Sequence, residues 1–297
     1  MTQINQQQET APHLPVAVSG ATGAQGGATA RALLRRGRPV RALTRRPDGP
    51  AAAGLRALGA ELVHADFDDE TSLSAALKGC GALFAMSTPF HTDLATEVRQ
   101  GIALLDAAAA APGMGHVVLT SATNADRRTG IPHFESKRRI EEHLAGLGVP
   151  WTVIGPGAFM ENYANGWTMT SLREGVFPLP MPPGSSLPVI SARDIGAFAA
   201  LVLTRTAEFT GRRVDIAAHW CAPERIAAAI SAASGRPIRF QEVPLTVAAT
   251  YSPDLETMFR YFQETGLDMD VEVLHRDHPE IGWQTIEEWA TARKWDL

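Results

Sequence analysis

The chain of 297 residues is long enough for one large domain or for a core with a smaller lobe, and 45% of its residues are hydrophobic. Its formal net charge of −5 provides no net basic field that could hold it on nucleic acid or on an anionic membrane, so neither is expected as a direct partner. The two cysteines, Cys80 and Cys221, lie far apart without C-x-x-C spacing, which indicates neither a disulfide framework nor a cysteine metal site.

The polar start of the chain bears on its location. Residues 1–13 lack the basic and then apolar pattern of a signal peptide, so they are predicted to be a disordered tail. No apolar run is long enough to cross a bilayer. Together with the wide spacing of the cysteines, these features predict a cytoplasmic protein. No metal is expected either, because His275 and His278 lie in a polar stretch without further ligands and are expected at the surface.

Short apolar runs alternate with helical patterns through the first half of the chain. The first strand is expected to start at Val16. Further strands are expected at Val40–Thr44, Glu61–His64, Ala82–Ser87, His116–Ser121 and Trp151–Ile154. Helices are expected between them, at about 24–36, 51–60, 70–77, 94–111 and 134–147. Because the runs show little polar alternation, we predict an α/β fold, a doubly wound parallel sheet covered on both faces, in residues 14–155.

The turn after the first strand carries three glycines. Gly20, Gly23 and Gly26 are spaced G-x-x-G-x-x-G, which departs from the usual G-x-G-x-x-G. Glycine allows a sharp turn, close approach of a pyrophosphate, and tight packing of the helix on the sheet. The turn and the helix start, which also contain Thr22, Ala24 and Gln25, are therefore predicted to bind a dinucleotide. A glycine-rich turn without a ligand is the alternative.

The pattern changes at Pro156, and residues 156–297 are predicted to form a smaller C-terminal cap lobe over the substrate site. A loop leads into a helix, and a proline-rich connection follows. Residues 187–204, an apolar strand and a helix, are expected to return to the core sheet. Helices near 223–233, 255–265 and 283–295 are expected to build the cap. A cap at the carboxyl ends of the strands would enclose a ligand.

Two arginines follow the second strand, where an NAD site places an acidic residue. The guanidinium of Arg45 can pair with a 2′-phosphate, so NADP(H) is predicted to be preferred over NAD(H). In the alternative, Arg45 and Arg46 are solvated and Asp48 binds the ribose. Asp66 and Phe67, after the third strand, are placed to contact adenine, unless they form only a helix-capping turn.

Three polar residues could line one pocket beyond the later strands. Ser121 ends a strand, His133 begins a helix, and Lys137 lies one turn further on the same face. With the glycines, they resemble the short-chain dehydrogenases/reductases, which use a serine and a Y-x-x-x-K motif to reduce carbonyls. Here histidine stands where that family has tyrosine. The chain's three tyrosines, at positions 163, 251 and 261, all lie elsewhere.

The histidine in place of tyrosine resembles one divergent branch of the short-chain dehydrogenases/reductases. The segments GATGAQG, LTRRP, HFESK, GVPWTVIGPGAFMENY and SARDIGAFAALVL resemble the NmrA-like family over nearly the whole chain. The resemblance implies a Rossmann core that binds NAD(P). Some members are redox-sensing regulators with little or no dehydrogenase activity, and others reduce quinones or similar acceptors.

Each candidate site residue has a structural alternative. Lys137 can hold the nicotinamide ribose hydroxyls or lie on the surface, and His133 can donate a proton or serve only the helix start. Ser121 either orients substrate or simply ends a strand. The remaining candidates are Ser87 and Pro156 for cofactor binding, Phe159 and Asn162 near the nicotinamide or in ordinary core, and Tyr163 as a reserve proton donor.

An electron-poor acceptor such as a quinone takes hydride to give a stabilised anion, so it depends less on a protein acid than a ketone does. The missing tyrosine therefore favours NADPH-dependent reduction of a small quinone-like molecule over alcohol oxidation. The alternative is a non-catalytic NADP(H) sensor that acts through a regulatory protein partner. The sequence leaves open whether the chain forms a homo-oligomer.

Overall fold

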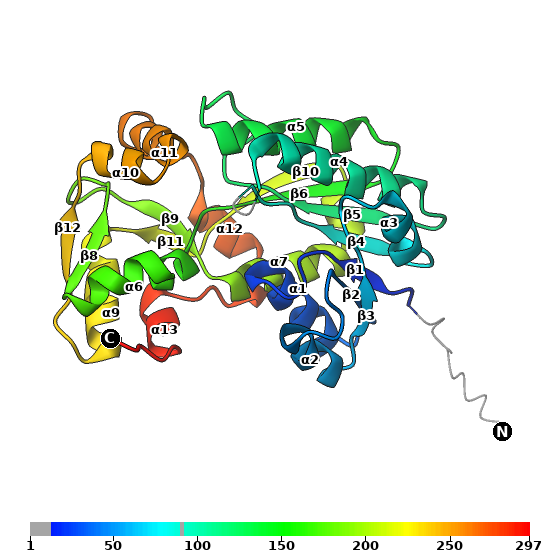
Figure 1. Cartoon of the computed structure of the whole chain (residues 1–297), viewed down its shortest axis with the longest axis horizontal. Helices are drawn as coiled ribbons and strands as arrows, with labels where there is room; N and C mark the ends of the chain where they lie inside the picture. Colours follow the sequence, from blue (N-terminus) through cyan, green and yellow to red (C-terminus); the bar gives the residue numbers. More distant parts are fainter. Residues whose placement is uncertain (1–12, 90–91) are drawn as a thin grey trace, which may run out of the picture.

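A seven-stranded parallel sheet forms the centre of the computed structural model, which describes residues 13–89 and 92–297 (Figure 1). The strand order is β10-β6-β5-β4-β1-β2-β3. The strands are β1 Val16–Val18, β2 Val40–Thr44, β3 Glu61–His64, β4 Ala82–Ala85, β5 His116–Thr120, β6 Trp151–Pro156 and β10 Arg212–Ile216. The predicted doubly wound fold is confirmed. The predicted tail, apart from His13, lies outside the described residues.

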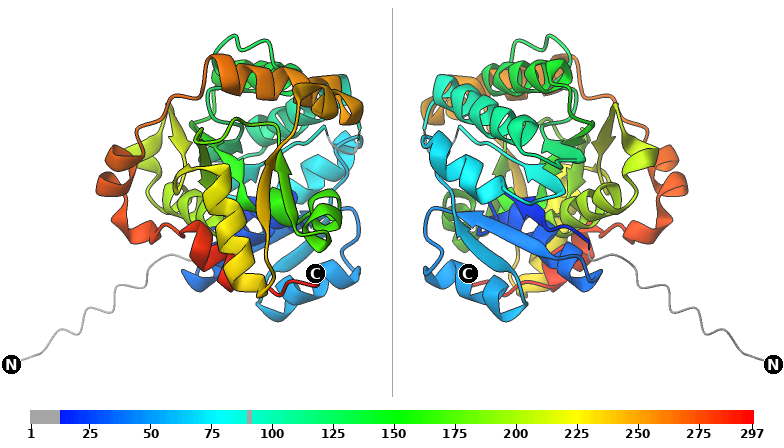
Figure 2. Two further views of the ribbon diagram at one scale, coloured as in Figure 1. Left: turned by 90° about the vertical axis from the view of Figure 1, so that its left-hand side faces the viewer. Right: turned by 90° about the vertical axis from the view of Figure 1, so that its right-hand side faces the viewer.

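Helices cover both faces of this sheet, as two views show (Figures 1 and 2). One layer contains α1 Ala24–Arg35, α2 Pro50–Ala57 and α7 Ala192–Thr204, and the other contains α3 Glu70–Leu77, α4 Leu94–Ala110 and α5 Pro132–Gly146. Alternate strand residues serve opposite layers: Val16 and Val18 pack with Leu33 of α1, while Ala17 packs with Leu104 of α4. Since both strand faces are buried, the strands read as continuous apolar runs.

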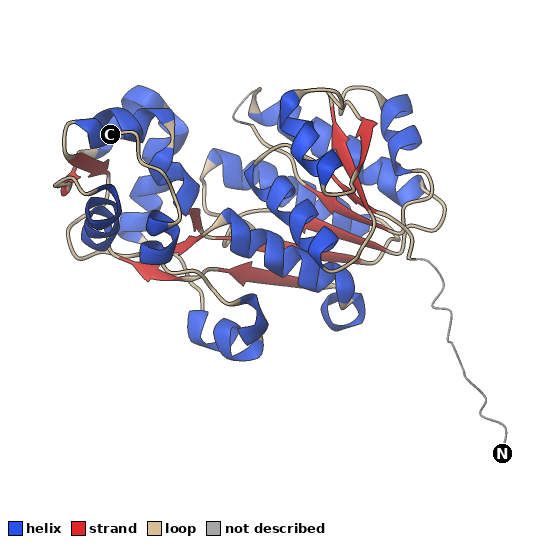
Figure 3. Ribbon diagram, turned by 90° about the horizontal axis from the view of Figure 1, so that it is seen from below, coloured by secondary structure: helices blue, strands red, loops and turns tan. Residues whose placement is uncertain are grey.

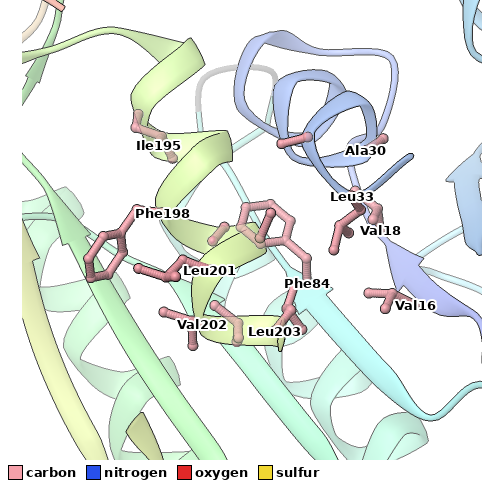
Figure 4. Packing of buried hydrophobic residues seen from close by; sticks show 14 of the residues in the cluster. Val16, Val18, Ala30, Leu33, Phe84, Ile195, Phe198, Leu201, Val202 and Leu203 are labelled. Carbon is pink, nitrogen blue, oxygen red and sulfur yellow. The ribbon is translucent and has the colours of Figure 1, made fainter. Parts of the chain in front are cut away.

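Helix α7 packs directly against α1. A Cβ added to Gly196 would lie 2.6 Å from the backbone nitrogen of Thr29, so only glycine permits this approach. Phe84 of β4 and Phe198 of α7, both fully buried, lie on opposite sides of the helix in one apolar cluster, where Phe198 contacts the ring of Phe209 (Figure 4). Helix α7 therefore belongs to the layer that α1 and α2 form on the core sheet.

The strand that enters the large sheet is not the one expected. Residues Leu187–Ile190 form β9, which pairs with β7 (Ala158–Phe159) and β11 (His219–Cys221) in a separate three-stranded sheet. Instead β10 pairs with β6 along 212–216. Its sequence, RRVDI, lacks an apolar run because an edge strand has a single partner and can carry charged residues.

The second lobe has an apolar core of its own, which includes Met160, Phe177, Ile226, Ile230 and Trp289. Figure 3 shows this group of short elements beside the larger sheet. Its elements are η1 Met160–Ala164, α6 Gly166–Arg173, β8 Val176–Leu179, α9 Pro223–Ser234, β12 Arg239–Glu242, α10 Leu245–Tyr251, α11 Pro253–Glu264 and α13 Ile286–Thr291.

Part of the C-terminal half belongs to the core rather than to the cap. The elements concerned are α8 Thr206–Phe209, α12 Val271–Asp277 and η2 Pro279–Ile281. Phe209, Leu274 and Ile281 are buried in the same apolar cluster as Phe198. The chain therefore crosses between the lobes several times. Across the described ranges, no helix is both long and apolar enough to cross a membrane.

Candidate functional site

A pocket of about 310 Å³ opens at the carboxyl ends of β1, β2, β3 and β4. The strand order reverses between β1 and β4, which is where doubly wound sheets bind ligands. The predicted cofactor residues that line it are Gly20, Thr22, Arg45, Asp66, Phe67 and Ser87. The fold thus brings together residues that are 67 positions apart in the sequence.

The turn between β1 and α1 has the geometry of an anion site. Gly20 has a φ of +59°, which disfavours a side chain, and a Cβ on Gly26 would lie 2.6 Å from the carbonyl oxygen of Ser19. Gly23 is the N-cap of α1 and provides no side-chain cap for the amides of the first turn, while Thr22 and Ala24 are exposed. Those amides and the helix dipole fit a pyrophosphate.

Gln25 lies in the first turn of α1, but its side chain has a partner within the protein. The Oε1 atom accepts a hydrogen bond of 2.9 Å from the hydroxyl of Thr120, the last residue of β5. This contact connects the start of α1 to β5, on the far side of the point where the strand order reverses. The backbone N–H of Gln25 is still one of the first-turn amides that have no acceptor within the helix.

The loop after β2 presents arginine rather than carboxylate to the pocket. Arg45 and Arg46 line it, and Arg45 is exposed. Asp48, the alternative ribose ligand, instead lies 3.1 Å from Arg56 in an exposed ion pair. No residue from 47 to 64 lines the pocket.

Asp66 and Phe67 also line the pocket, and the cap of the next helix is a different residue. Asp69 caps α3, where its carboxylate accepts hydrogen bonds from the backbone N–H groups of Thr71 and Ser72. Asp66 Oδ1 accepts the N–H of Asp68 at 3.0 Å, which closes a tight turn. The pair thus stabilises a turn and faces the pocket at the same time.

Lys137 adjoins this pocket through Ser87. Its Nζ donates to the carbonyl oxygen of Ser87 at 2.6 Å and lies 2.8 Å from Oε1 of Glu97, whose side chain is fully buried. Ser136 donates to the other oxygen of Glu97. Sequence reasoning missed Glu97 because it lies in the first turn of α4, where acidic residues are ordinary. The buried carboxylate neutralises the ammonium.

His133, at the start of α5, contacts a carboxylate from the distant α11. Its Nδ1 lies 2.6 Å from Oδ2 of Asp254, and its backbone N–H donates to Oδ1 at 3.0 Å. The two side chains are only 13% and 21% exposed. Burial alone would raise the pKa of Asp254, yet the contacts with His133 hold that pKa below its usual value.

Ser121 faces a buried ionic network instead of the pocket. Its hydroxyl donates to Glu141, whose other oxygen accepts from Arg213 Nε at 3.0 Å. Burial raises the pKa of Glu141 although Arg213 and Ser121 oppose the shift. Arg213 also pairs with Asp215 on β10. This network joins β5, α5 and β10, so the serine hydroxyl already serves the packing of the sheet.

The other predicted residues lie between core and cap. Tyr163 is buried in the apolar cap cluster, where no residue of the described part accepts its hydroxyl, and burial raises its pKa well above the usual value. Phe159 packs against the core cluster, Pro156 is buried at the end of β6, and Asn162 is exposed. None of the four lines the pocket at β1–β4.

Comparison with known proteins assigns the family. The model of the NmrA-like family matches residues 13–290. An NAD(P)H azoreductase of Xenophilus azovorans is 31% identical over 237 residues, which cover 78% of each chain. An NADPH-dependent quinone oxidoreductase of Escherichia coli, complexed with NADPH, has a similar fold, with a TM-score of 0.76, 24% identity, and coverage of 93% of this chain and 98% of that one.

A second solved structure with the same fold is a regulator. NmrA, a negative transcriptional regulator in complex with NAD, has a TM-score of 0.78 and 22% identity, and the match covers 95% of both chains. Enzymes and a regulator thus share this architecture. The match over residues 13–290 confirms the resemblance in the sequence, and the chain belongs to the NmrA-like family.

Proposed function

We propose that this protein binds NADP(H) in the pocket at β1–β4 and reduces a small electron-poor acceptor, such as a quinone. The observation that carries the proposal is the glycine turn with its uncapped helix start, combined in one pocket with the arginines that follow β2. The azoreductase and the quinone oxidoreductase among its relatives support a reductase.

The arginines support NADP(H) over NAD(H). A guanidinium beside the adenosine ribose pairs with the 2′-phosphate, whereas NAD sites use a carboxylate there. Asp48, the alternative ribose ligand, does not line the pocket, and its exposed carboxylate lies 3.1 Å from Arg56. Asp66 and Asp68 lie beyond β3, on the side where adenine would lie.

Binding measurements test this preference. We expect NADPH to bind more tightly than NADH and R45A to weaken NADPH binding about tenfold, which corresponds to about 1.4 kcal/mol, with little effect on NADH. R35A is the matched control, because Arg35 is exposed at the far end of α1. Tighter binding of NADH, or unchanged NADPH affinity in R45A, would contradict the NADP(H) preference.

The surroundings of Lys137 suit positioning rather than acid catalysis. Of the three protons of its ammonium, one goes to Glu97 and one to the Ser87 carbonyl, while the third makes only a long contact of 3.4 Å with the Ser87 hydroxyl, which a ribose hydroxyl would replace. The bound cofactor would supply the hydride. Because the reduced acceptor is a stabilised anion, the site needs a proton donor only after hydride transfer, and His133, one turn before Lys137 on the same face of α5, is the candidate.

A steady-state assay with NADPH and a panel of quinones and azo compounds tests the reductase. We expect saturable NADPH oxidation that is lost in K137M. No turnover with any acceptor, combined with intact tight binding of NADPH, would overturn the enzyme proposal and favour a sensor. A sensor would also be compatible with this fold, since the regulator NmrA has a similar one.

A further inference from the structure

The contact between His133 and Asp254 joins two parts of the chain that are 121 residues apart. His133 belongs to the core helix α5, and Asp254 belongs to α11, whose side chains Met258 and Phe262 pack against Phe134 and Ile131. Figures 1 and 2 show α11 beside α5. Asp254 is itself fixed, since its N–H donates to the hydroxyl of the N-cap Ser252 at 3.2 Å.

We propose that Asp254 is a positioning residue that holds the Nδ1–H form of His133, so that Nε2 is the atom that exchanges a proton with the reduced acceptor. This inference rests on the proposed reductase function. It gives a role to a cap residue that lies outside the cofactor pocket.

The distance between His133 Nδ1 and Asp254 Oδ2 indicates which ring nitrogen carries the hydrogen. A bare nitrogen lone pair 2.6 Å from a carboxylate oxygen would be repelled, so Nδ1 must carry hydrogen. The second oxygen of Asp254 accepts the backbone N–H of His133, so the carboxylate is held at two points. A ring held in this way presents one defined nitrogen for proton exchange, as in other carboxylate–histidine pairs.

The position of His133 matches the proposed reaction. Lys137 lies one turn along α5 and bonds to Ser87, which lines the cofactor pocket. His133 contacts Asp254 of α11, and Lys137, one turn along α5, is paired with Glu97 of α4. Asp254 is therefore placed to stabilise an imidazolium.

The step balances without another reactant. The bound NADPH would supply the hydride, the imidazolium of His133 gives its Nε2 proton to the resulting anion, and the imidazole then takes up one proton from the solvent, so that the reaction consumes one proton in total. Asp254 stays ionised throughout and neither gains nor loses a proton. Its contribution is to keep the ring oriented and to favour the charged form.

Histidine NMR tests the contact without turnover. In protein labelled with ¹⁵N-histidine, and with the His133 signals assigned through H133Q, we expect the neutral ring to carry its hydrogen on Nδ1. In D254N the tautomer ratio should shift toward Nε2–H. An unchanged tautomer ratio would overturn the proposal.

Kinetics tests the positioning role. D254N should lower kcat about tenfold and move the basic limb of its pH profile to lower pH, while KM and the Kd of NADPH stay within about twofold. D254E should restore part of the rate. A fall in thermal stability with kcat and pH profile unchanged would mean that Asp254 only attaches α11 to α5, and would overturn the proposal.

D268N is the matched control, because Asp268 forms an exposed ion pair of 2.8 Å with Arg127 between the same two parts of the chain. It should leave both the tautomer and the pH profile unchanged. If the wild-type protein reduces no acceptor, the reductase function fails, and the tautomer measurement still decides whether Asp254 controls His133. The two failures are therefore distinguishable.

Discussion

The imidazole of His116, the first residue of β5, is held neutral inside the protein. Thr152 Oγ1 donates to the carbonyl of Phe209 at 2.8 Å, so it must accept from Nε2–H of His116 at 2.9 Å. Nδ1 is buried without a partner among the described residues. Burial lowers the pKa of His116 from 6.5 to about 4, because protonation would leave an unpaired charge there.

Because His116 is buried in its neutral form, the folded protein is expected to lose stability in acid. Its folded pKa lies below the unfolded one, so its contribution is fully present above pH 6.5 and is lost as the pH falls toward 4. At pH 5 the free energy of unfolding should be lower by about 2 kcal/mol on this account. Urea unfolding of H116Q at pH 7 and pH 5 should show a smaller difference than the wild-type protein, and an equal difference would contradict the assignment.

Glu97 shows at the same scale why a site residue can escape sequence reasoning. Its carboxylate is fully buried and paired with Lys137, but nothing in LATEVRQG distinguishes it from a solvated residue. Lys137 could be proposed as a site residue from its position four residues after His133. The carboxylate that neutralises it lies on another helix, α4, and only the packing of α4 against α5 decides which carboxylate that is.

The element that organises the cofactor site is the turn from β1 into α1. Its three glycines could be recognised in the sequence, and the structure gives two of them a steric reason: positive φ at Gly20 and backbone contact at Gly26. The nonstandard spacing still brings the helix start close to the strand end. Local chemistry therefore sufficed to predict this part of the site.

Substituting two glycines separates this geometry from general helix stability. G26A should lower the melting temperature and weaken NADPH binding at least tenfold, because its Cβ would lie 2.6 Å from Ser19 O. G54A, within α2 and with no atom within 4 Å of the added Cβ, should stabilise the protein by up to about 1 kcal/mol and leave binding unchanged. Equal NADPH affinity in G26A and the wild-type protein would argue against a phosphate at this turn.

At the scale of the whole molecule, the core sheet includes elements from both halves of the chain. The core sheet takes its edge strand β10 from the C-terminal half, and α7 buries the face of the sheet that α1 leaves open. The sequence pattern changes after residue 155, where the boundary of the core was predicted. The core sheet nevertheless includes a strand from beyond that position, β10.

Truncation tests this dependence. A fragment that ends at Pro156 lacks β10 and α7, so it would expose Phe84, Val118 and Ile154, which pack in the same cluster as α7. We expect it to bind a hydrophobic dye and to lack dispersed NMR signals, whereas the full chain unfolds in one transition. A cooperative, native-like fragment would show that residues 14–156 fold independently.

The sequence by itself determined the alternation of strands and helices, the glycine turn, the arginines after β2 and the family, because these depend on short-range pattern and on spacing along the chain. Tertiary structure decided which strand completes the sheet, that Ser121 serves an ionic network, that Glu97 neutralises Lys137 and that Asp254 meets His133. Each of these pairs residues from separate elements, and such contacts follow from packing, which no local pattern specifies.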